Sequence, residues 1–477
     1  MKTNTLDFDA QALREKILDL AMRGKLVPQD PNDEPASVLL EKIKAEKEQL
    51  IKDKKIKKSK PLAPITDDER PFDIPDSWEW VRLGDVNTYN SESVHPDRTP
   101  DKTFELYSVP IFPTRKPEII KGEEIRSNKQ AVETGDVLLC KINPRINRVW
   151  KVSNFTDNEN IASTEWIVVR QREITTEYLR YSLMAPYFRN LLQSNVSGVG
   201  GSLTRAKPRE VRNYVLPIPP LSEQSRIAAK IAQLFALLRK VESSTQQYAQ
   251  LQTLLKSKVL DLAMRGKLVE QDPHDEPASV LLEKIKAEKE QLVKEGKIKK
   301  SKPLPPIADD EKPFDIPDSW EWVRLGDIIE LVSGRDIAKK YHLSHKIHNA
   351  TPYITGASNI DDKGNITINE WIDNPSVVVT KGTLLLSVKG TIGKIAILQL
   401  PKAHIARQIM GIENIYNFNQ DFQKYFLESY IGELKKKAKS MIPGISRNDI
   451  ILAPFPLPSL REQSIIAKKI HKIMSLI

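Results

Sequence analysis

The 477-residue sequence is poor in cysteine, in aromatic residues and in long apolar runs. The single cysteine, Cys140, excludes a disulfide within the chain and a CxxC zinc site, which indicates a reducing compartment. No run of 18 apolar residues occurs, so no membrane-spanning helix is expected. The polar segment 1–16 lacks the apolar core of a signal peptide. At 6% aromatic residues, a binder of single strands that works by base stacking is disfavoured. We therefore expect a cytoplasmic protein with no membrane contact.

Catalytic motifs are also missing. The stretch GTIGK (390–394) is not a phosphate-binding loop, because Ile395 stands where Ser or Thr should follow the lysine. PDSWE (75–79 and 317–321) has two acids but no lysine at the spacing that a metal-dependent nuclease needs, and we interpret it as a turn leading into buried tryptophans. No glycine-rich motif indicates a nucleotide pocket. Four histidines lack metal-binding spacing, namely His342, His345, His348 and His404. We expect no metal site and no catalysis by this chain.

The positive charge is unevenly placed. The chain has a net charge of +10, of which residues 86–215 contribute +4 and residues 328–452 contribute +5. A basic surplus weakly indicates a nucleic-acid partner. A solvated surface that happens to be basic explains it about as well.

An internal repeat organises the chain. Residues 17–85 recur at 259–327 without a gap, and 60 of these 69 positions are identical. A weaker repeat relates 216–238 to 455–477. Each half therefore contains a helix, a linker, a variable basic segment, a proline-rich exit and a second helix. The variable segments share a predicted strand, turn and strand at 135–149 and 382–398, which predicts two domains of one fold with different surfaces.

Apolar spacing predicts helices at the centre and at both ends of the chain. The centre, 222–265, is interrupted by the polar stretch ESSTQQ (242–247), which predicts a helical hairpin or coiled coil. Copies of its two helices lie at the ends of the chain, so we expect them to pair and rebuild the hairpin, although two ordinary core helices fit the periodicity too. The C-terminal copy stops at Ile477, level with Leu238, so we expect either a trimmed chain or a slightly asymmetric pair of helices. The predicted seam consists of Ile227, Ile231, Leu234, Leu238, Val241, Leu251, Leu255, Val259, Leu262, Ile466, Ile470, Ile473, Leu13, Ile17 and Leu20.

The helices suggest two mechanical roles. A first helix of about 24 residues spans roughly 36 Å, close to one turn of B-DNA, so it can set the spacing between two DNA contacts. The lysine-rich helices at 41–50 and 283–292 balance their charge with glutamate, and we interpret them as solvated faces. Two equal surfaces on one chain can hold two copies of one partner.

Three kinds of motif carry a family resemblance. They are LAMRGKLV (20–27), IPDSWEWVRLGD entering each variable segment, and the exits LPIPPLSEQSRIAAKI and FPLPSLREQSIIAKKI, the second with Ser459 in place of a proline. The stretches GDVLLCKI (135–142) and STEWIVVR (163–170) add to them. Together they make the chain resemble the specificity subunit of type I restriction-modification systems over essentially its whole length.

The resemblance implies a function and partners. Each variable segment is expected to be a target recognition domain that reads one half of an asymmetric, bipartite site in double-stranded DNA. The helices are expected to act as a spacer and to dock two methyltransferase subunits, with restriction subunits joining the complex in a prokaryotic cytoplasm. S-adenosylmethionine, ATP and Mg²⁺ are expected on these partners and no cofactor on this chain. The alternatives are a non-catalytic coiled-coil scaffold and a DNA-modifying enzyme with a cryptic active site.

The resulting fold class is α+β, with two mixed α/β target recognition domains separated by antiparallel coiled-coil helices in a pseudo-two-fold, circular organisation. The expected parts are an N-terminal helix that pairs with the C-terminal one (1–27), a lysine-rich helix and linker (28–70), the first recognition domain (71–221), the central hairpin (222–269), a second lysine-rich helix and linker (270–312), the second recognition domain (313–460) and a C-terminal helix (461–477).

The residues expected to contact DNA are cations and amides in predicted turns, because Lys and Arg bind phosphates while Arg, Lys, Asn and Gln bind base edges. The first domain offers them in the inter-strand turn and after the loop SGVGGSLT (197–204), and the second in corresponding places. The candidates are Lys141, Arg145, Arg148, Arg205, Lys207, Arg209, Lys389, Lys394, Arg407, Gln408 and Arg447.

Overall fold

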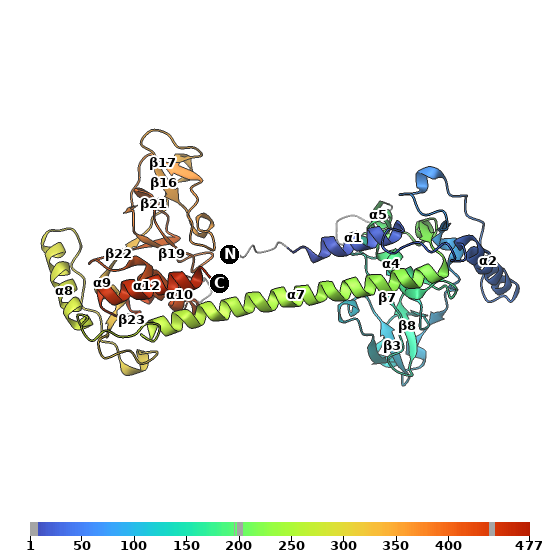
Figure 1. The fold of residues 1–477 in the computed structure, drawn as a ribbon, viewed down its shortest axis with the longest axis horizontal. Helices are drawn as coiled ribbons and strands as arrows, with labels where there is room; N and C mark the ends of the chain where they lie inside the picture. Colours follow the sequence, from blue (N-terminus) through green and yellow to red (C-terminus); the bar gives the residue numbers. More distant parts are fainter. Residues whose placement is uncertain (1–7, 195, 198–203, 438–443) are drawn as a thin grey trace. The chain divides into compact units, whose positions relative to one another are not determined.

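The computed structural model describes residues 8–194, 196–197, 204–437 and 444–477 (Figure 1). The chain divides into two compact units, residues 1–245 and 246–477. The division falls inside the helix α7 (Leu221–Met264), so each unit owns one part of this helix. Each unit is described by itself below.

Helix α7 is one uninterrupted helix of 44 residues, so of the two alternatives predicted for 222–269, a hairpin or a coiled coil, the hairpin is wrong. The polar stretch 242–247 that interrupts the apolar spacing is itself helical. The reason lies in the sequence, because residues 221–264 contain neither glycine nor proline, and serine, threonine and glutamine are tolerated in a helix. The 36 Å spacing rested on a helix of 24 residues and is therefore also wrong.

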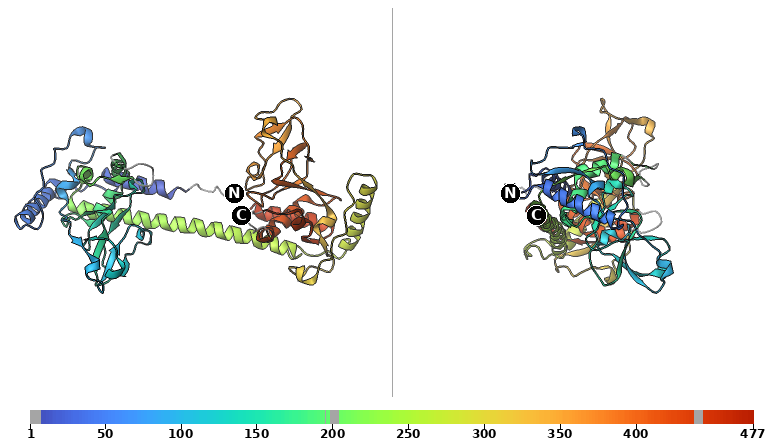
Figure 2. Two further views of the ribbon diagram at one scale, coloured as in Figure 1. Left: turned by 180° about the vertical axis from the view of Figure 1, so that it is seen from behind. Right: turned by 90° about the vertical axis from the view of Figure 1, so that its right-hand side faces the viewer.

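In the first unit, the N-terminal helix α1 (Ala10–Met22) packs against the first part of α7 (Figures 1 and 2). Leu18 and Met22 of α1 share a hydrophobic core with Ile227 and Ile231 of α7. Farther along, Arg14 Nη1 donates to Glu242 Oε1 at 2.9 Å. As the chain runs from Arg14 to Met22 along α1, its partners in α7 run back from Glu242 toward Ile227, so the two helices are antiparallel.

The second unit repeats this arrangement with the C-terminal helix α12 (Leu460–Met474). Ile466 and Ile470 share a core with Val259 and Ala263 of α7. The Gln252 amide donates to the main-chain oxygen at Ile477. Two-helix packing is therefore built within each unit, from a terminal helix and its own part of α7. The pairing of the two terminal helices with each other involves both units and stays a prediction.

The predicted seam residues differ in burial. Six are buried, namely Ile227, Ile231, Leu238, Val259, Ile466 and Ile470. Five are half-buried, namely Leu234, Leu262, Ile473, Ile17 and Leu20. Four are exposed, namely Leu13, Val241, Leu251 and Leu255. The exposed members of α7 lie near its middle, between the part that ends at Leu238 in the core of the first unit and the part that begins at Val259 in the core of the second.

The globular part of the first unit combines short helices with small sheets. A five-stranded sheet has the order β2-β5-β8-β3-β4, in which β3 and β8 are parallel, and a three-stranded sheet has the order β7-β6-β9. The strands are β1 (Glu79–Arg82), β2 (Ser93–Val94), β3 (Thr103–Tyr107), β4 (Glu118–Lys121), β5 (Lys129–Ala131), β6 (Val137–Cys140), β7 (Val149–Lys151), β8 (Glu159–Ser163), β9 (Trp166–Val169), β10 (Val196–Ser197), β11 (Arg205–Ala206) and β12 (Val215–Ile218); the helices are α2 (Ala36–Lys52), α3 (Leu83–Val86), α4 (Thr176–Met184), α5 (Pro186–Ser194) and α6 (Pro208–Val211).

The second unit has the same plan with different lengths. Its sheets have the orders β14-β22-β19-β20 and β15-β17-β16-β21-β18, and β16 and β21 are parallel. The strands are β13 (Glu321–Arg324), β14 (Ile329–Ser333), β15 (His342–Leu343), β16 (Thr351–Ile354), β17 (Glu370–Ile372), β18 (Val378–Thr380), β19 (Leu384–Ser387), β20 (Ile395–Ile397), β21 (Lys402–Ile405), β22 (Ile409–Asn414) and β23 (Pro454–Leu457); the helices are α8 (Ala278–Lys294), α9 (Leu325–Ile328), α10 (Gln420–Lys437) and α11 (Arg447–Ile451).

These elements confirm the predicted α+β class with two domains. They also confirm the predicted strand, turn and strand in each variable segment, because β6 pairs antiparallel with β7 and β19 with β20. Each domain begins and ends on one strand pair, β1 with β12 and β13 with β23.

The repeated tryptophan motif fixes each domain to the helix that follows it, α7 in the first unit and α12 in the second. The buried Trp78 indole donates to Glu223 Oε2 at 2.9 Å, and Gln29 donates to the other carboxylate oxygen. The copy is Trp320, which donates to Glu462 at 2.8 Å. Burial raises the pKa of both glutamates, while the donated hydrogen bonds favour their charged form. The predicted turn is present, with Trp78 N donating to Pro75 O, but only the first tryptophan of each copy is buried. Trp80 and Trp322 are half-buried, and Glu79 is exposed.

The predicted helices at 41–50 and 283–292 lie within α2 and α8. They are not solvated all round, because Leu39 and Ile43 are buried and Lys47 Nζ donates to Gly84 O at 2.7 Å. Beyond α2 the chain turns at Lys54, which has φ 57°, and the copy of this residue is Gly296 with φ 71°. A left-handed backbone favours glycine, so the first unit holds a lysine where its repeat has the residue that fits best.

Candidate nucleic-acid interface

In the first unit the predicted cations gather around the turn between β6 and β7. The turn contains Pro144–Ile146 as one 3₁₀ turn, flanked by Asn143 and Asn147 in left-handed conformations that asparagine tolerates. The main chain joins this turn to the segment before α6, because Ala206 N donates to Lys141 O at 2.8 Å and Asn143 N donates to Thr204 O. The fold thus brings 141–148 next to 204–209. Of the predicted loop 197–204, residues 198–203 lie outside the described part of the chain.

Three of the predicted cations in this unit are already engaged. Lys141 Nζ donates to Thr164 O at 2.7 Å, and Arg148 Nη1 donates to Ile142 O at 3.3 Å. Glu165 Oε2 lies 3.9 Å from Lys141 Nζ and 3.4 Å from Arg205 Nε. Sequence reasoning missed this acidic partner, since Glu165 is distant along the chain from both cations. These residues therefore support the shape of the turn and are poorer candidates for direct DNA contact.

Arg145, Lys207 and Arg209 are exposed at the same corner. Within the described residues none of the three side chains forms an ion pair. Lys207 precedes α6 and Arg209 lies in it, while Arg145 is at the tip of the turn. Free, long cationic side chains on a short turn suit phosphate or base contact.

In the second unit the corresponding turn runs from 388 to 394 and joins β19 to β20. Ile445 N donates to Val388 O at 2.9 Å, matching the bond from Ala206 to Lys141 in the first unit. Val388 N also donates to Gln408 O, which brings the 406–408 loop to the same corner. Gln408 lies against Gly356, where an added Cβ would stand 2.5 Å from Gln408 Oε1.

Acidic side chains engage three of the predicted residues here as well. Lys394 pairs with Asp362, and Arg407 Nε lies 2.7 Å from Asp336 Oδ2. Arg447 donates to Leu331 O and lies 3.7 Å from Glu330, so it joins α11 to β14. Lys389 and Gln408 remain exposed at the turn, and Lys389 has no ion-pair partner among the described residues.

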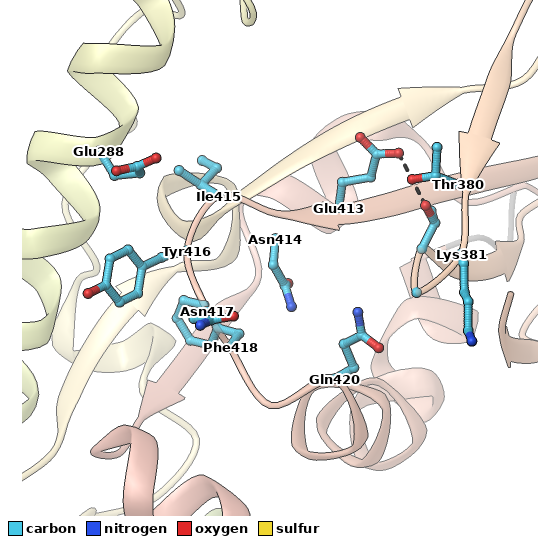
Figure 3. Close-up of a pocket in the computed structure, with 12 residues that line it drawn as sticks. Glu288, Thr380, Lys381, Glu413, Asn414, Ile415, Tyr416, Asn417, Phe418 and Gln420 are labelled. Carbon is cyan, nitrogen blue, oxygen red and sulfur yellow. Dashed lines mark hydrogen bonds between the residues drawn. The ribbon is translucent and has the colours of Figure 1, made fainter. Parts of the chain in front are cut away.

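One polar cavity lies elsewhere in the second unit, beside α8 and the start of α10 (Figure 3). Its volume is about 620 Å³. Glu288 and Glu413 line it together with Asn414 and Gln420, and Glu413 accepts a hydrogen bond from Thr383 at 3.1 Å. Lys381 also lines the cavity, but two carboxylates against one lysine leave its charge negative, which disfavours phosphate, so we do not count it as part of the DNA interface.

The sequence predicts neither a metal site nor a membrane-spanning helix, and the structure can be searched for both. Within residues 8–194, 196–197, 204–437 and 444–477, no group of three or more His, Cys, Asp or Glu is placed to hold a metal ion. His404 is buried, its Nδ1 accepts from Val377 N, and burial lowers its pKa. Among the described helices none combines the length and apolarity needed to cross a bilayer.

Comparison with known proteins decides the family. The family model described as "Type I restriction modification DNA specificity domain" matches residues 75–252 and 317–477, which together are more than half of the chain. The chain belongs to this family. The two matches cover both globular domains, and the first also covers α7 as far as residue 252, so this family member contains two DNA specificity domains.

Curated relatives carry the same description. The specificity subunit of the type I restriction enzyme EcoAI from Escherichia coli is 34% identical, over 98% of this chain and 89% of the relative. The specificity subunit of EcoEI, also from Escherichia coli, is 39% identical over 68% of this chain and 62% of the relative. The chain is therefore a type I restriction-modification specificity subunit by family.

Solved structures share the fold. The HsdS subunit of Thermoanaerobacter tengcongensis matches with a TM-score of 0.52 at 23% identity, over 85% of this chain and 91% of that one. A chain from a structure on complex assembly and conformational transition of the type I restriction-modification system gives a TM-score of 0.62 at 23% identity, over 85% and 92%. At this identity the likeness supports the two-domain α+β architecture alone.

Proposed function

We propose that this specificity subunit binds double-stranded DNA through the turn corners of its two domains, each reading one half of a bipartite site. One observation supports the proposal above all: the two domains share a fold, but the turns at 141–148 and 388–394, with the segments beside them, expose different side chains. The first offers Arg145, Lys207 and Arg209, and the second offers Lys389 and Gln408. Arginine and lysine match the acceptor edge of guanine and glutamine matches adenine, so different corners favour different half-sites. The complete site is then asymmetric.

The duplicated framework supports a partner in two copies. Helices α2 and α8 are almost identical in sequence, and α1 and α12 each lie on one part of α7. Equal surfaces in both units suit two methyltransferase subunits, to which restriction subunits join. On this proposal the chain is not an enzyme. S-adenosylmethionine, ATP and Mg²⁺ belong to the partner subunits, and the complex acts on chromosomal DNA in a prokaryotic cytoplasm.

The proposal is tested by exchanging one domain between the paired strands that close it. Replacing residues 79–218 with the corresponding domain of a relative of different specificity should change one half of the methylated motif and leave the other half intact. The matched control exchanges residues 321–457 and should change the opposite half. Methylation is mapped over a whole genome in cells that also contain the methyltransferase subunit. An exchange that alters both halves together, or neither half, would refute separate reading.

A further inference from the structure

Two short segments outside the recognition domains are rich in lysine and occupy equivalent places in the two units. Residues 52–60 contain six lysines and one aspartate, and residues 294–302 contain five lysines and one glutamate. Their net charges are +5 and +4. Each follows the lysine-rich helix of its unit, α2 or α8, and neither belongs to a recognition domain.

The lysine side chains of both segments point into solvent and are mostly unpaired. All eleven are exposed. Lys55 lies 4.0 Å from Asp53 and Lys297 lies 2.7 Å from Glu295. The other nine form no ion pair with any described residue. Such a concentration of like charge repels itself and is stabilised by an anionic partner.

Both ends of each segment are fixed to its unit. The helix α2 ends at Lys52, and the chain beyond the first segment is held where Arg82 donates to Ala63 O and Pro64 O. In the copy, Arg324 donates to Pro305 O and Pro306 O. The lysines thus lie on a short connecting segment, from the end of a helix through a turn, whose position is set at both ends.

Lys54 makes the first segment one charge richer than its copy. It is one of nine positions at which the long repeats differ, and it occupies the left-handed position that ends α2, with φ 57°, where the copy has Gly296 at φ 71°.

We propose that residues 52–60 and 294–302 bind the phosphate backbone of DNA without reading its sequence. This inference rests on the proposed function, because it assigns a second contact to the same ligand. The segments are nearly identical although the two recognition corners differ, so their ligand presents the same chemistry to both units. The phosphate backbone does so. A protein partner fits less well, since lysine is depleted at the centre of protein interfaces and these stretches offer little apolar surface.

The test compares two variants of the full chain, purified with the methyltransferase subunit. In the neutral variant all eleven lysines are changed to glutamine, and in the matched control the same eleven are changed to arginine, which keeps the charge. Binding is measured over a range of salt concentrations, with one duplex that carries the methylated motif and one that lacks it. The slope of log affinity against log salt should fall by about 0.9 for each phosphate that the protein no longer neutralises, and by about two or more in total for the neutral variant. Both duplexes should bind more weakly by a similar factor, so the preference for the motif should persist, and the arginine variant should match the wild type.

Two results would overturn the inference. One is an unchanged salt slope in the neutral variant. The other is dissociation of the methyltransferase subunit from the neutral but not the arginine variant, which would assign the segments to a protein interface. Failure of the proposed function looks different, because the wild-type complex would then show no preference for the duplex that carries the motif.

Discussion

Replacing Arg82 with alanine destabilises the first unit by about 3 kcal/mol, the lower end of the range for breaking a buried ion pair. The Arg82 side chain is 4% exposed and its guanidinium makes five hydrogen bonds. Two go to Glu69, two to carbonyls at residues 63 and 64, and one to the carbonyl of Asn213. One side chain therefore joins the linker, β1 and the segment before β12, and no alanine replaces those donors. The lower end applies because Glu69 is 38% exposed and water screens the pair.

The copy provides a matched test in the same chain. Arg324 is 5% exposed and makes the equivalent bonds to Glu311, Pro305, Pro306 and Leu452. Denaturant unfolding of Arg82→Ala and Arg324→Ala should show similar losses of stability, each in the transition of its own unit. A loss below about 1 kcal/mol in either variant would contradict this expectation, since that is the effect of an ordinary surface ion pair.

The pH dependence of this contact follows from its carboxylate. Hydrogen bonds from Arg82 lower the pKa of Glu69 from 4.5 to about 2. A carboxylate with a lowered pKa stabilises the fold above its ordinary pKa, and the contribution disappears as the pH falls from about 4 toward 2. In Arg82→Ala this part of the acid sensitivity should be absent.

Replacing Gly24 with alanine destabilises the first unit by about 3 kcal/mol, from backbone strain and overpacking together. Gly24 has φ +67°, and an added Cβ would lie 2.4 Å from Pro75 Cγ and 2.7 Å from Pro75 Cδ. Gly266 has φ +66° and the same two distances to Pro317. The MRGKLV and IPDSW motifs are thus the two sides of one contact, in which a glycine ends a helix against a proline ring.

Gly296 separates the two causes. It also has a left-handed backbone, with φ +71°, but nothing lies within 4 Å of the position of an added Cβ. Gly296→Ala should therefore cost only the strain, about 1 kcal/mol. Chemical denaturation of Gly24→Ala, Gly266→Ala and Gly296→Ala measures the difference. Equal losses of stability in all three would show that the proline contact adds nothing.

The internal repeat made the two-domain architecture predictable. The spacing of apolar residues did not show how the two helical stretches at the centre of the chain are connected. Apolar spacing identified the buried positions Ile227, Ile231 and Val259, because a helical face repeats with a fixed period. It could not show whether two such stretches form a hairpin or one helix. The absence of glycine and proline between 221 and 264 was the better signal, since a turn between antiparallel helices usually needs one of them.

The candidate site was predictable in outline for a similar reason. Strand, turn and strand follow from local residues, so the turns at 141–148 and 388–394 are where the sequence predicted them. Ion pairing is a property of the tertiary structure. The residues next to each cation in the sequence do not indicate that Glu165 pairs with Lys141 and Arg205, or that Asp336 pairs with Arg407. The lysine-rich segments 52–60 and 294–302 do not raise the net charge of the residues outside the variable segments, because acidic residues elsewhere in that part offset them.

Above all, we propose that this chain determines which DNA sequence its complex methylates. The most direct test maps adenine methylation by single-molecule sequencing in a host with and without this chain, while the methyltransferase subunit is kept present. We predict that removing the chain abolishes methylation at one motif made of two different halves around an unread spacer, and that restoring the chain restores it. An unchanged methylation pattern, with the chain shown to co-purify with an active methyltransferase subunit, would contradict the proposal.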